Sequence, residues 1–87
     1  MKTKIFNYQD QADPDRMNIV VMVCLEHNGT EPHVHMLQQS LARTPTNYDE
    51  YMKKTPHNWG HIVLSASDFP KLTKQIKQAV KDLKAEP

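Results

Sequence analysis

The sequence predicts an α+β fold in which a small antiparallel sheet of about four strands is followed by a C-terminal helix (ββββα). Two observations predict this class. Residues 17–26 are dense in β-branched side chains and lead through Asn28-Gly29 into a second alternating segment. Apolar side chains then recur at helical spacing over residues 69–83. The length of 87 residues suits a single domain, residues 1–87.

The first two strands follow from composition and length. Residues 4–8 are a candidate for a short first strand, and the polar segment 9–15 then turns the chain. Residues 17–26 are too short and too uniformly apolar for an amphipathic helix. They are therefore predicted to form the central strand of the sheet.

A hairpin is predicted after the central strand. Asn28-Gly29 is the strongest short-range hairpin signal, because both residues tolerate a positive φ, and residues 33–39 form the returning strand. With this dipeptide at the centre of the turn, the numbers of cross-strand partners add up to 57, which places Val21 opposite Met36. Pro32 cannot donate to the ladder, so a wider or bulged loop is an alternative.

The two faces of this hairpin differ in character. One face is fully apolar and is expected to pack against the C-terminal helix; it holds Ile19, Val21, Val23, Leu25, Val34 and Met36. The other face is softer and is expected to stay open for a ligand or partner; it holds Val20, Met22, Cys24, His33, His35 and Leu37.

The long connection over residues 40–59 is predicted to contain a short helix at residues 48–54. Asn47 is a suitable N-cap, acidic residues occupy the first turn, and Lys53 and Lys54 occupy the last turn, which complements the helix dipole. Connections of this length are uncommon in compact domains unless they serve a function.

The last elements are a strand and a helix. Gly60 opens a fourth strand at residues 61–64, and Ser67 is predicted to cap the C-terminal helix. The side chains of the helix that face the core form one stripe: Phe69, Leu72, Ile76, Ala79, Val80 and Leu83. A basic ridge lies beside that stripe: Lys74, Lys77, Lys81 and Lys84.

Composition narrows the class of protein. A hydrophobic share of 38% and a charged share of 24% are those of a folded chain rather than a disordered one. Cys24 is the single cysteine, so no internal disulfide can form and a reducing compartment is expected. The longest apolar run, residues 19–25, is far shorter than the roughly 20 residues that cross a bilayer. Without a recognisable secretory signal, we expect a soluble, cytoplasmic protein.

The distribution of charge carries more information than its sum. A net charge of +1 creates no chain-wide positive field. Residues 1–66 hold six Lys/Arg and seven Asp/Glu, whereas residues 67–87 hold five Lys and three Asp/Glu. Only the C-terminal helix is therefore expected to carry a local positive field.

Histidine and cysteine side chains suggest two kinds of reactive centre. His33 and His35 share one face of a strand, and His57 and His61 lie near another strand, so four imidazoles could bind zinc. Cys24 is predicted to lie opposite His33, but an apolar strand raises the pKa of a thiol instead of activating it. No nucleophile elbow or phosphate-binding loop is present in the sequence. We predict no enzyme activity, no cofactor and no metal, and keep zinc as a third hypothesis.

Basic and aromatic residues gather in the long connection. Single-stranded nucleic acid is held by cations along its phosphates and by aromatic faces on which bases stack. The connection supplies both kinds of side chain: Arg43, Tyr48, Tyr51, Lys53, Lys54, His57 and Trp59. The alternative is that Trp59 and one tyrosine fill the core while the lysines are merely solvated.

Two segments resemble a known family. Residues 28–36 ("NGTEPHVHM") and 60–83 ("GHIVLSASDFPKLTKQIKQAVKDL") are similar to the second half of the positive-cofactor-four proteins, transcriptional coactivators that bind single-stranded DNA. The matching positions are Gly60, Ile62, Leu64, Phe69, Leu72 and Ile76. The resemblance implies four strands, a C-terminal helix and a homodimer that binds DNA along its sheet. The resemblance also implies that five residues contact DNA: His33, His35, Lys53, Lys54 and Trp59.

Two functional hypotheses follow. The leading one is a small dimeric protein that binds single-stranded nucleic acid, DNA rather than RNA. We expect this protein to act in transcription and not to bind membranes. Its candidate binding residues are His33, His35, Arg43, Tyr51, Lys53, Lys54, His57 and Trp59. The alternative is a non-enzymatic protein-interaction module on the same fold, such as a bacterial or phage accessory protein. A sheet face without Lys or Arg favours this alternative.

Overall fold

The computed structural model describes residues 1–38, 43–54 and 61–86. The elements in chain order are β1 (Lys2–Tyr8), β2 (Ile19–Leu25), β3 (His33–Gln38), α1 (Tyr48–Lys54), a 3₁₀ turn (Ala66–Asp68) and α2 (Phe69–Ala85). The chain is an α+β fold with an antiparallel sheet and a C-terminal helix, as predicted, and the short helix at residues 48–54 is confirmed. None of the helices within the described ranges is long and apolar enough to cross a membrane.

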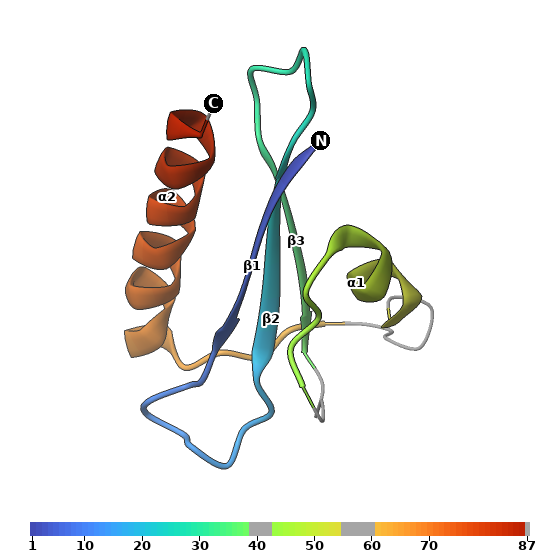
Figure 1. Cartoon of the computed structure of the whole chain (residues 1–87). Helices are drawn as coiled ribbons and strands as arrows, with labels where there is room; N and C mark the ends of the chain where they lie inside the picture. The colour runs from blue at the N-terminus through green and yellow to red at the C-terminus, as the bar shows by residue number, and fades with distance from the viewer. Residues whose placement is uncertain (39–42, 55–60, 87) are drawn as a thin grey trace.

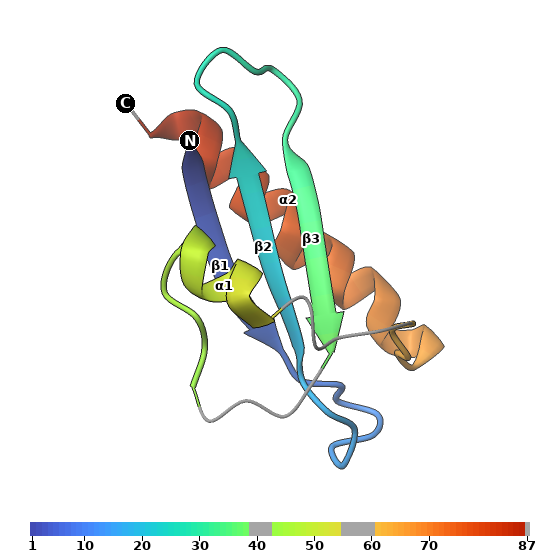
Figure 2. The ribbon, with the colours of Figure 1, turned by 90° about the vertical axis from the view of Figure 1, so that its right-hand side faces the viewer.

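The sheet has the strand order β1-β2-β3, and both pairs of strands are antiparallel (Figure 2). β2 is the central strand, and all seven of its residues are buried. Its β-branched side chains suit a position that is covered on both faces. Val21 lies opposite Met36 of β3 and opposite Phe6 of β1, so the predicted register of the hairpin is confirmed.

The loop of the hairpin is wider than the two-residue turn that the sequence predicts. Strand pairing stops at Cys24 and His33, and residues 26–32 connect the strands. The turn begins earlier than predicted, at Glu26, whose carbonyl accepts a hydrogen bond of 3.0 Å from the Gly29 N–H. Pro32 precedes β3 and has no N–H with which to extend the ladder. The predicted register is unchanged, since Cys24 still lies opposite His33.

Helix α2 covers one face of the sheet, where it packs on β1 and β2 (Figure 1). The buried members of this core are Tyr8, Ile19, Val21, Val23, Leu25, Leu72, Ala79 and Leu83. Val34 and Met36 of β3 share that face but remain 41% and 45% exposed, so their predicted place in the core is wrong. Phe69 is 64% exposed, again against prediction, because it is the first residue of α2 and the helix begins outside the outline of the sheet (Figure 2).

Helix α1 covers the opposite face, which the sequence predicts to be open. The buried members of this second core are Val20, Met22, Cys24, Leu37 and Tyr51. The local sequence builds the helix as predicted: the Asn47 side chain accepts a hydrogen bond of 2.9 Å from the Glu50 N–H, and the Glu50 carboxylate accepts one of 2.9 Å from the Thr46 N–H. The expectation that this face is free for a ligand along its length is therefore wrong.

The predicted fourth strand is absent, because residues 61–64 form no strand ladder. They instead meet the end of β3, where the amide side chain of Gln38 acts as a short substitute for a neighbouring strand. The Val63 N–H donates to Gln38 Oε1 over 2.8 Å, and Gln38 Nε2 donates to the Val63 carbonyl over 2.9 Å. The sheet within the described residues has three strands rather than four.

The start of α2 differs from the predicted Ser67 cap. Asp68 holds the N-cap position, and its side chain makes no capping hydrogen bond. The carboxylate turns to the β1–β2 connection, where it accepts hydrogen bonds from the Tyr8 hydroxyl (2.5 Å) and from the N–H groups of Gln11 (2.9 Å) and Ala12 (3.1 Å). Asp68 therefore ties the start of α2 to the end of β1.

Candidate functional site

The two strand histidines from the predicted binding set lie on the face of β3 that α1 covers. His33 is exposed, and His35 is half-buried beside Tyr51, with the two rings edge to face at a centroid distance of 6.2 Å and an interplanar angle of 72°. Tyr51 is only 2% exposed, and burial raises the pKa of its hydroxyl. Its ring fills the core under α1 and offers no open face on which a base could stack.

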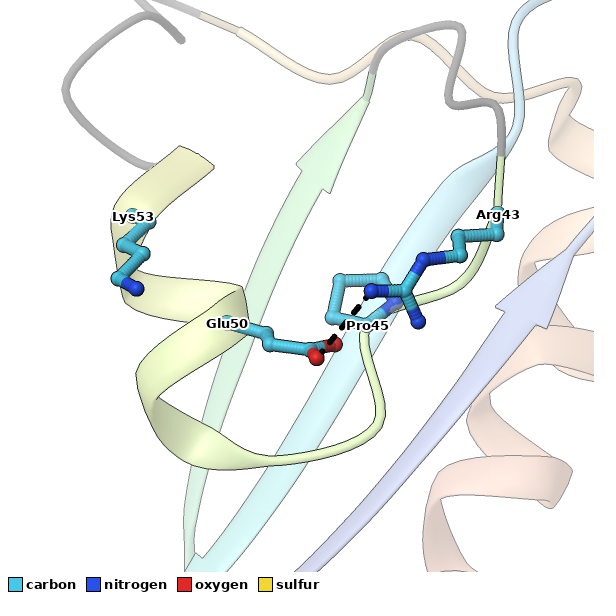
Figure 3. Close-up of a pocket in the computed structure, with 4 residues that line it drawn as sticks. All are labelled: Arg43, Pro45, Glu50 and Lys53. Carbon is cyan, nitrogen blue, oxygen red and sulfur yellow. Dashed lines mark hydrogen bonds and ion pairs between the residues drawn. The ribbon is translucent and has the colours of Figure 1, made fainter.

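Arg43 and Lys53 from the same set line a shallow cavity of about 280 Å³ together with Pro45 and Glu50 (Figure 3). Arg43 Nη2 lies 3.3 Å from the Glu50 carboxylate, and Lys53 points away from this pair. The hydrogen bond from the Thr46 N–H, together with Arg43, holds the pKa of Glu50 below its ordinary value. Glu50 matches the charge of Arg43, so Lys53 is the cation of this lining that forms no ion pair with a described residue.

The rest of the predicted set cannot be placed at this site. The side chain of Lys54, and both His57 and Trp59, lie outside the described residues. The proposed zinc set depends on His57 as well, and His61 is exposed at the start of the next described segment. The described ranges contain no group of three or more His, Cys, Asp or Glu side chains that could hold a metal ion.

Cys24 lies opposite His33 in the ladder, as predicted, but its surroundings do not activate a thiolate. The side chain is 2% exposed in the core beneath α1. Burial first, and the charge of Glu26 second, raise the pKa of the Cys24 thiol. Cys24 is consequently a small core residue rather than a nucleophile.

The sheet face under α1 carries no basic side chain other than histidine. The strand residues on this face follow from the register: Thr3, Ile5, Asn7, Val20, Met22, Cys24, His33, His35 and Leu37. A surface that follows a nucleic-acid backbone needs Lys or Arg along it. The absence of both from these strand positions favours the protein-interaction hypothesis over binding along the sheet.

A feature that the sequence reasoning missed is the outer side of β3, called here the β3 edge and marked by Val34 and Met36. No strand within the described ranges pairs with this side of β3. Val34 and Met36 are exposed beside it, and the strand His33–Gln38 contains no Asp, Glu, Lys or Arg. A helix is about 10 Å wide and neighbouring strands lie about 4.8 Å apart, so one helix covers about two strands and leaves the side chains of a third strand exposed. The signal in the sequence was that only one long helix is predicted to cover this face.

The lysine ridge, defined as Lys74, Lys77, Lys81 and Lys84, lies on the outer side of α2 as predicted. All four side chains are exposed, and none makes an ion pair with a described residue. Lys71, one turn earlier, instead donates a hydrogen bond of 2.8 Å to Gln11. The ridge is a compact group of unmatched positive charges on a chain whose net charge is only +1.

Two buried carboxylates organise the connection between β1 and β2. Asp10 is 2% exposed and accepts hydrogen bonds from the N–H groups of Ala12, Asp13 and Ser65 and from the Arg16 side chain. Burial opposes ionisation of Asp10, but these donors outweigh it and lower its pKa. The hydrogen bond that the Ala12 N–H donates to the Asp10 carboxylate forms an Asx turn. The preference of Asp for such turns is the part of this network that the sequence could indicate. Since its oxygens already have partners, Asp10 has a structural role.

Asp68 completes this network from the start of α2, where it is fully buried. The hydrogen bond from the Tyr8 hydroxyl is the main reason that the pKa of Asp68 is lowered. Burial first, and the hydrogen bond to Asp68 second, raise the pKa of Tyr8 to about 12. No buried side-chain nitrogen or oxygen in the described part of the chain lacks a hydrogen-bond partner.

Comparison with known proteins adds no relative. No protein-family model, no curated protein and no solved structure matches this chain. The resemblance to the positive-cofactor-four proteins therefore stays a prediction.

Proposed function

We propose that this chain is a non-enzymatic protein-interaction module that binds its partner through the β3 edge. The observation that carries the proposal is a strand edge that pairs with no strand of the described residues and lies beside two exposed apolar side chains, Val34 and Met36. An open strand edge offers backbone donors and acceptors for strand addition, and the neighbouring side chains give the partner apolar contacts. The strand itself holds no charge that would have to be desolvated on binding.

The alternative function, binding of single-stranded nucleic acid along the sheet, has less support. Binding of single-stranded nucleic acid on the face under α1 requires that this helix move away from a core built around Tyr51 and Met22. The strands of that face contribute His33 and His35 but no Lys or Arg. The two buried carboxylates and the buried thiol are engaged in the fold, which agrees with a role other than catalysis.

The test compares the wild-type chain with a Val34→Lys/Met36→Lys variant as bait in an extract of the source cell. A partner identified by mass spectrometry is purified, and its affinity is measured by calorimetry. We expect the double variant to weaken binding about tenfold or more, because strand pairing would bury two lysines. Val63→Lys is the matched control, since Val63 is as exposed as Val34 and lies outside β3. Equal binding by the wild-type chain and the double variant would overturn the proposal.

A second candidate function, binding of single-stranded nucleic acid, is supported by the lysine ridge on α2. In this second proposal, the nucleic acid would bind along the helix rather than along the sheet. Four exposed lysines without acidic partners can neutralise phosphates and release their counterions. The ridge consists of lysine alone, and the exposed aromatic side chain of α2, Phe69, lies at the start of the helix, so recognition along the ridge would depend on charge.

Fluorescence anisotropy with a fluorescein-labelled oligothymidine tests this second function. If all four lysines contact phosphates, the logarithm of the association constant should fall with the logarithm of salt concentration with a slope of about −3. Lys77→Glu/Lys81→Glu should abolish binding, and Lys53→Glu should leave it unchanged. A larger effect of Lys53→Glu would move the site to the α1 region that the sequence predicts. No anisotropy change at low ionic strength would exclude this function.

A further inference from the structure

The two edges of the sheet differ in how they are protected. At β1, Lys2 Nζ donates to the carbonyls of Leu83 (3.3 Å) and Glu86 (2.6 Å), and Lys4 lies 3.7 Å from the Glu86 carboxylate. Lysines on an edge strand are a common device that prevents edge-to-edge association. These contacts also attach β1 to the end of α2, so this edge is both charged and held by the helix.

Within the described residues, the β3 edge has neither a lysine nor a hydrogen bond that attaches it to α2. The six residues of β3 pair with β2 in one uninterrupted register, so no bulge twists the edge away from a neighbour. The strand contains no charged residue and no proline. Val34 and Met36 leave an apolar surface beside the edge. An unprotected edge of this kind pairs readily with another uncharged, extended strand.

β3 is itself such a strand, and its side chains are complementary to a second copy of themselves. A twofold axis perpendicular to the sheet keeps each face on its own side. Residues that become opposite one another must therefore belong to the same face of β3. An axis through His35 places Val34 opposite Met36 of the second copy, and the reverse, so two apolar pairs form side by side. An axis through Val34 would place Met36 opposite Pro32, outside the strand.

We propose that the partner of the β3 edge is a second copy of this chain, paired antiparallel through β3 around His35 to give one continuous six-stranded sheet. This inference rests on the proposed function and names its partner. The apolar pairs that Val34 and Met36 form across the axis lie on the α2 face, where both side chains are exposed.

The mass in solution is the first test, measured by sedimentation from about 1 µM to about 500 µM protein. The mass should rise with concentration from the 10.1 kDa of the single chain to twice that value. Val34→Lys and Met36→Lys should each keep the chain at its monomer mass with an unchanged circular dichroism spectrum, while Val63→Lys should still dimerise. A constant monomer mass for the wild-type chain, or dimers that persist in both β3 variants, would overturn the inference.

Disulfide trapping tests the register. In a Cys24→Ser background, His35→Cys should form a disulfide-linked dimer on mild oxidation, because residues directly opposite one another lie within disulfide reach. His33→Cys should not, since this register places His33 opposite Leu37. Equal crosslinking of the two variants would overturn the His35 axis. If the chain is monomeric but the β3 variants lose a different identified partner, the proposed function stands and the second copy is excluded.

Discussion

Removal of the Tyr51 side chain should uncover the sheet face that α1 protects, and Cys24 reports this change directly. Tyr51 is 2% exposed and Cys24 lies in the same core with 2% exposure. α1 has seven residues, too few for a stable helix on its own, so its position depends on such contacts. Truncation of a large buried ring costs about 3 kcal/mol. If that free energy holds α1 in place, opening becomes roughly 150-fold more frequent.

The assay is the rate at which Cys24 reacts with excess Ellman's reagent under native conditions. Because Cys24 is the single cysteine, the signal has one origin. Tyr51→Ala should raise the rate by roughly 150-fold. Leu83→Ala, on the other face, is the control, since Leu83 is fully buried in the core beneath α2. This control should lower the midpoint of urea unfolding with a much smaller change in labelling. Equal labelling of the two variants would refute the reasoning that α1 protects this face.

Three further predictions concern single contacts. Because the pKa of Asp68 is lowered in the folded state, Asp68 stabilises the fold above its unfolded pKa of about 4, and this stabilisation is lost as the pH falls. In a plot of melting temperature against pH, Asp68→Asn should therefore reduce the decrease on the acid side. Gln38→Ala removes both hydrogen bonds to Val63 and the one that Gln38 Nε2 donates to the Met17 carbonyl, and it should cost about 1 kcal/mol in urea unfolding. Unchanged stability of the Gln38→Glu variant would exclude this role of the side-chain amide. Asn47→Ala removes the cap of α1, so it should cost about 1 kcal/mol of helix stability and speed labelling of Cys24, and unchanged labelling would contradict this.

The parts of the fold that the sequence predicts correctly are those set by local patterns. The β2–β3 register follows from alternation along the strands, so Val21 faces Met36 even though the loop between them is wider than predicted. The cap at Asn47 and the acids after it likewise specify α1 without reference to the rest of the chain. These features depend on residues that are close in sequence or directly paired.

Packing between elements was harder to predict. The apolar stripe of α2 shows that the helix packs on the sheet, but it does not show which strands it covers. Val34 and Met36 have the same character as Val21 and Val23, and only the width of the helix separates the exposed pair from the buried pair. The position of α1 was missed for a related reason, since a helix of seven residues has too few apolar positions to indicate its target.

The missing fourth strand has a different cause. Residues 61–64 have the composition of a strand, and their backbone still meets the end of β3. The donor and acceptor that they use belong to a side chain, that of Gln38, rather than to a strand backbone. Side-chain amides can imitate the spacing of a peptide group, and hydrophobic patterns contain no sign of such a substitution.

The exposure of the candidate site, the β3 edge, has the same cause, the limited width of α2. One helix on a three-stranded sheet leaves the side chains of one strand uncovered, so exposure at β3 by itself indicates no function. The chemistry of the two edges provides the distinction. β1 carries Lys2 and Lys4, both bound to the end of α2, whereas β3 carries no charge beside its exposed Val34 and Met36. An edge that is merely uncovered tolerates lysine at little cost, so Val34→Lys and Met36→Lys should leave stability unchanged and affect only association.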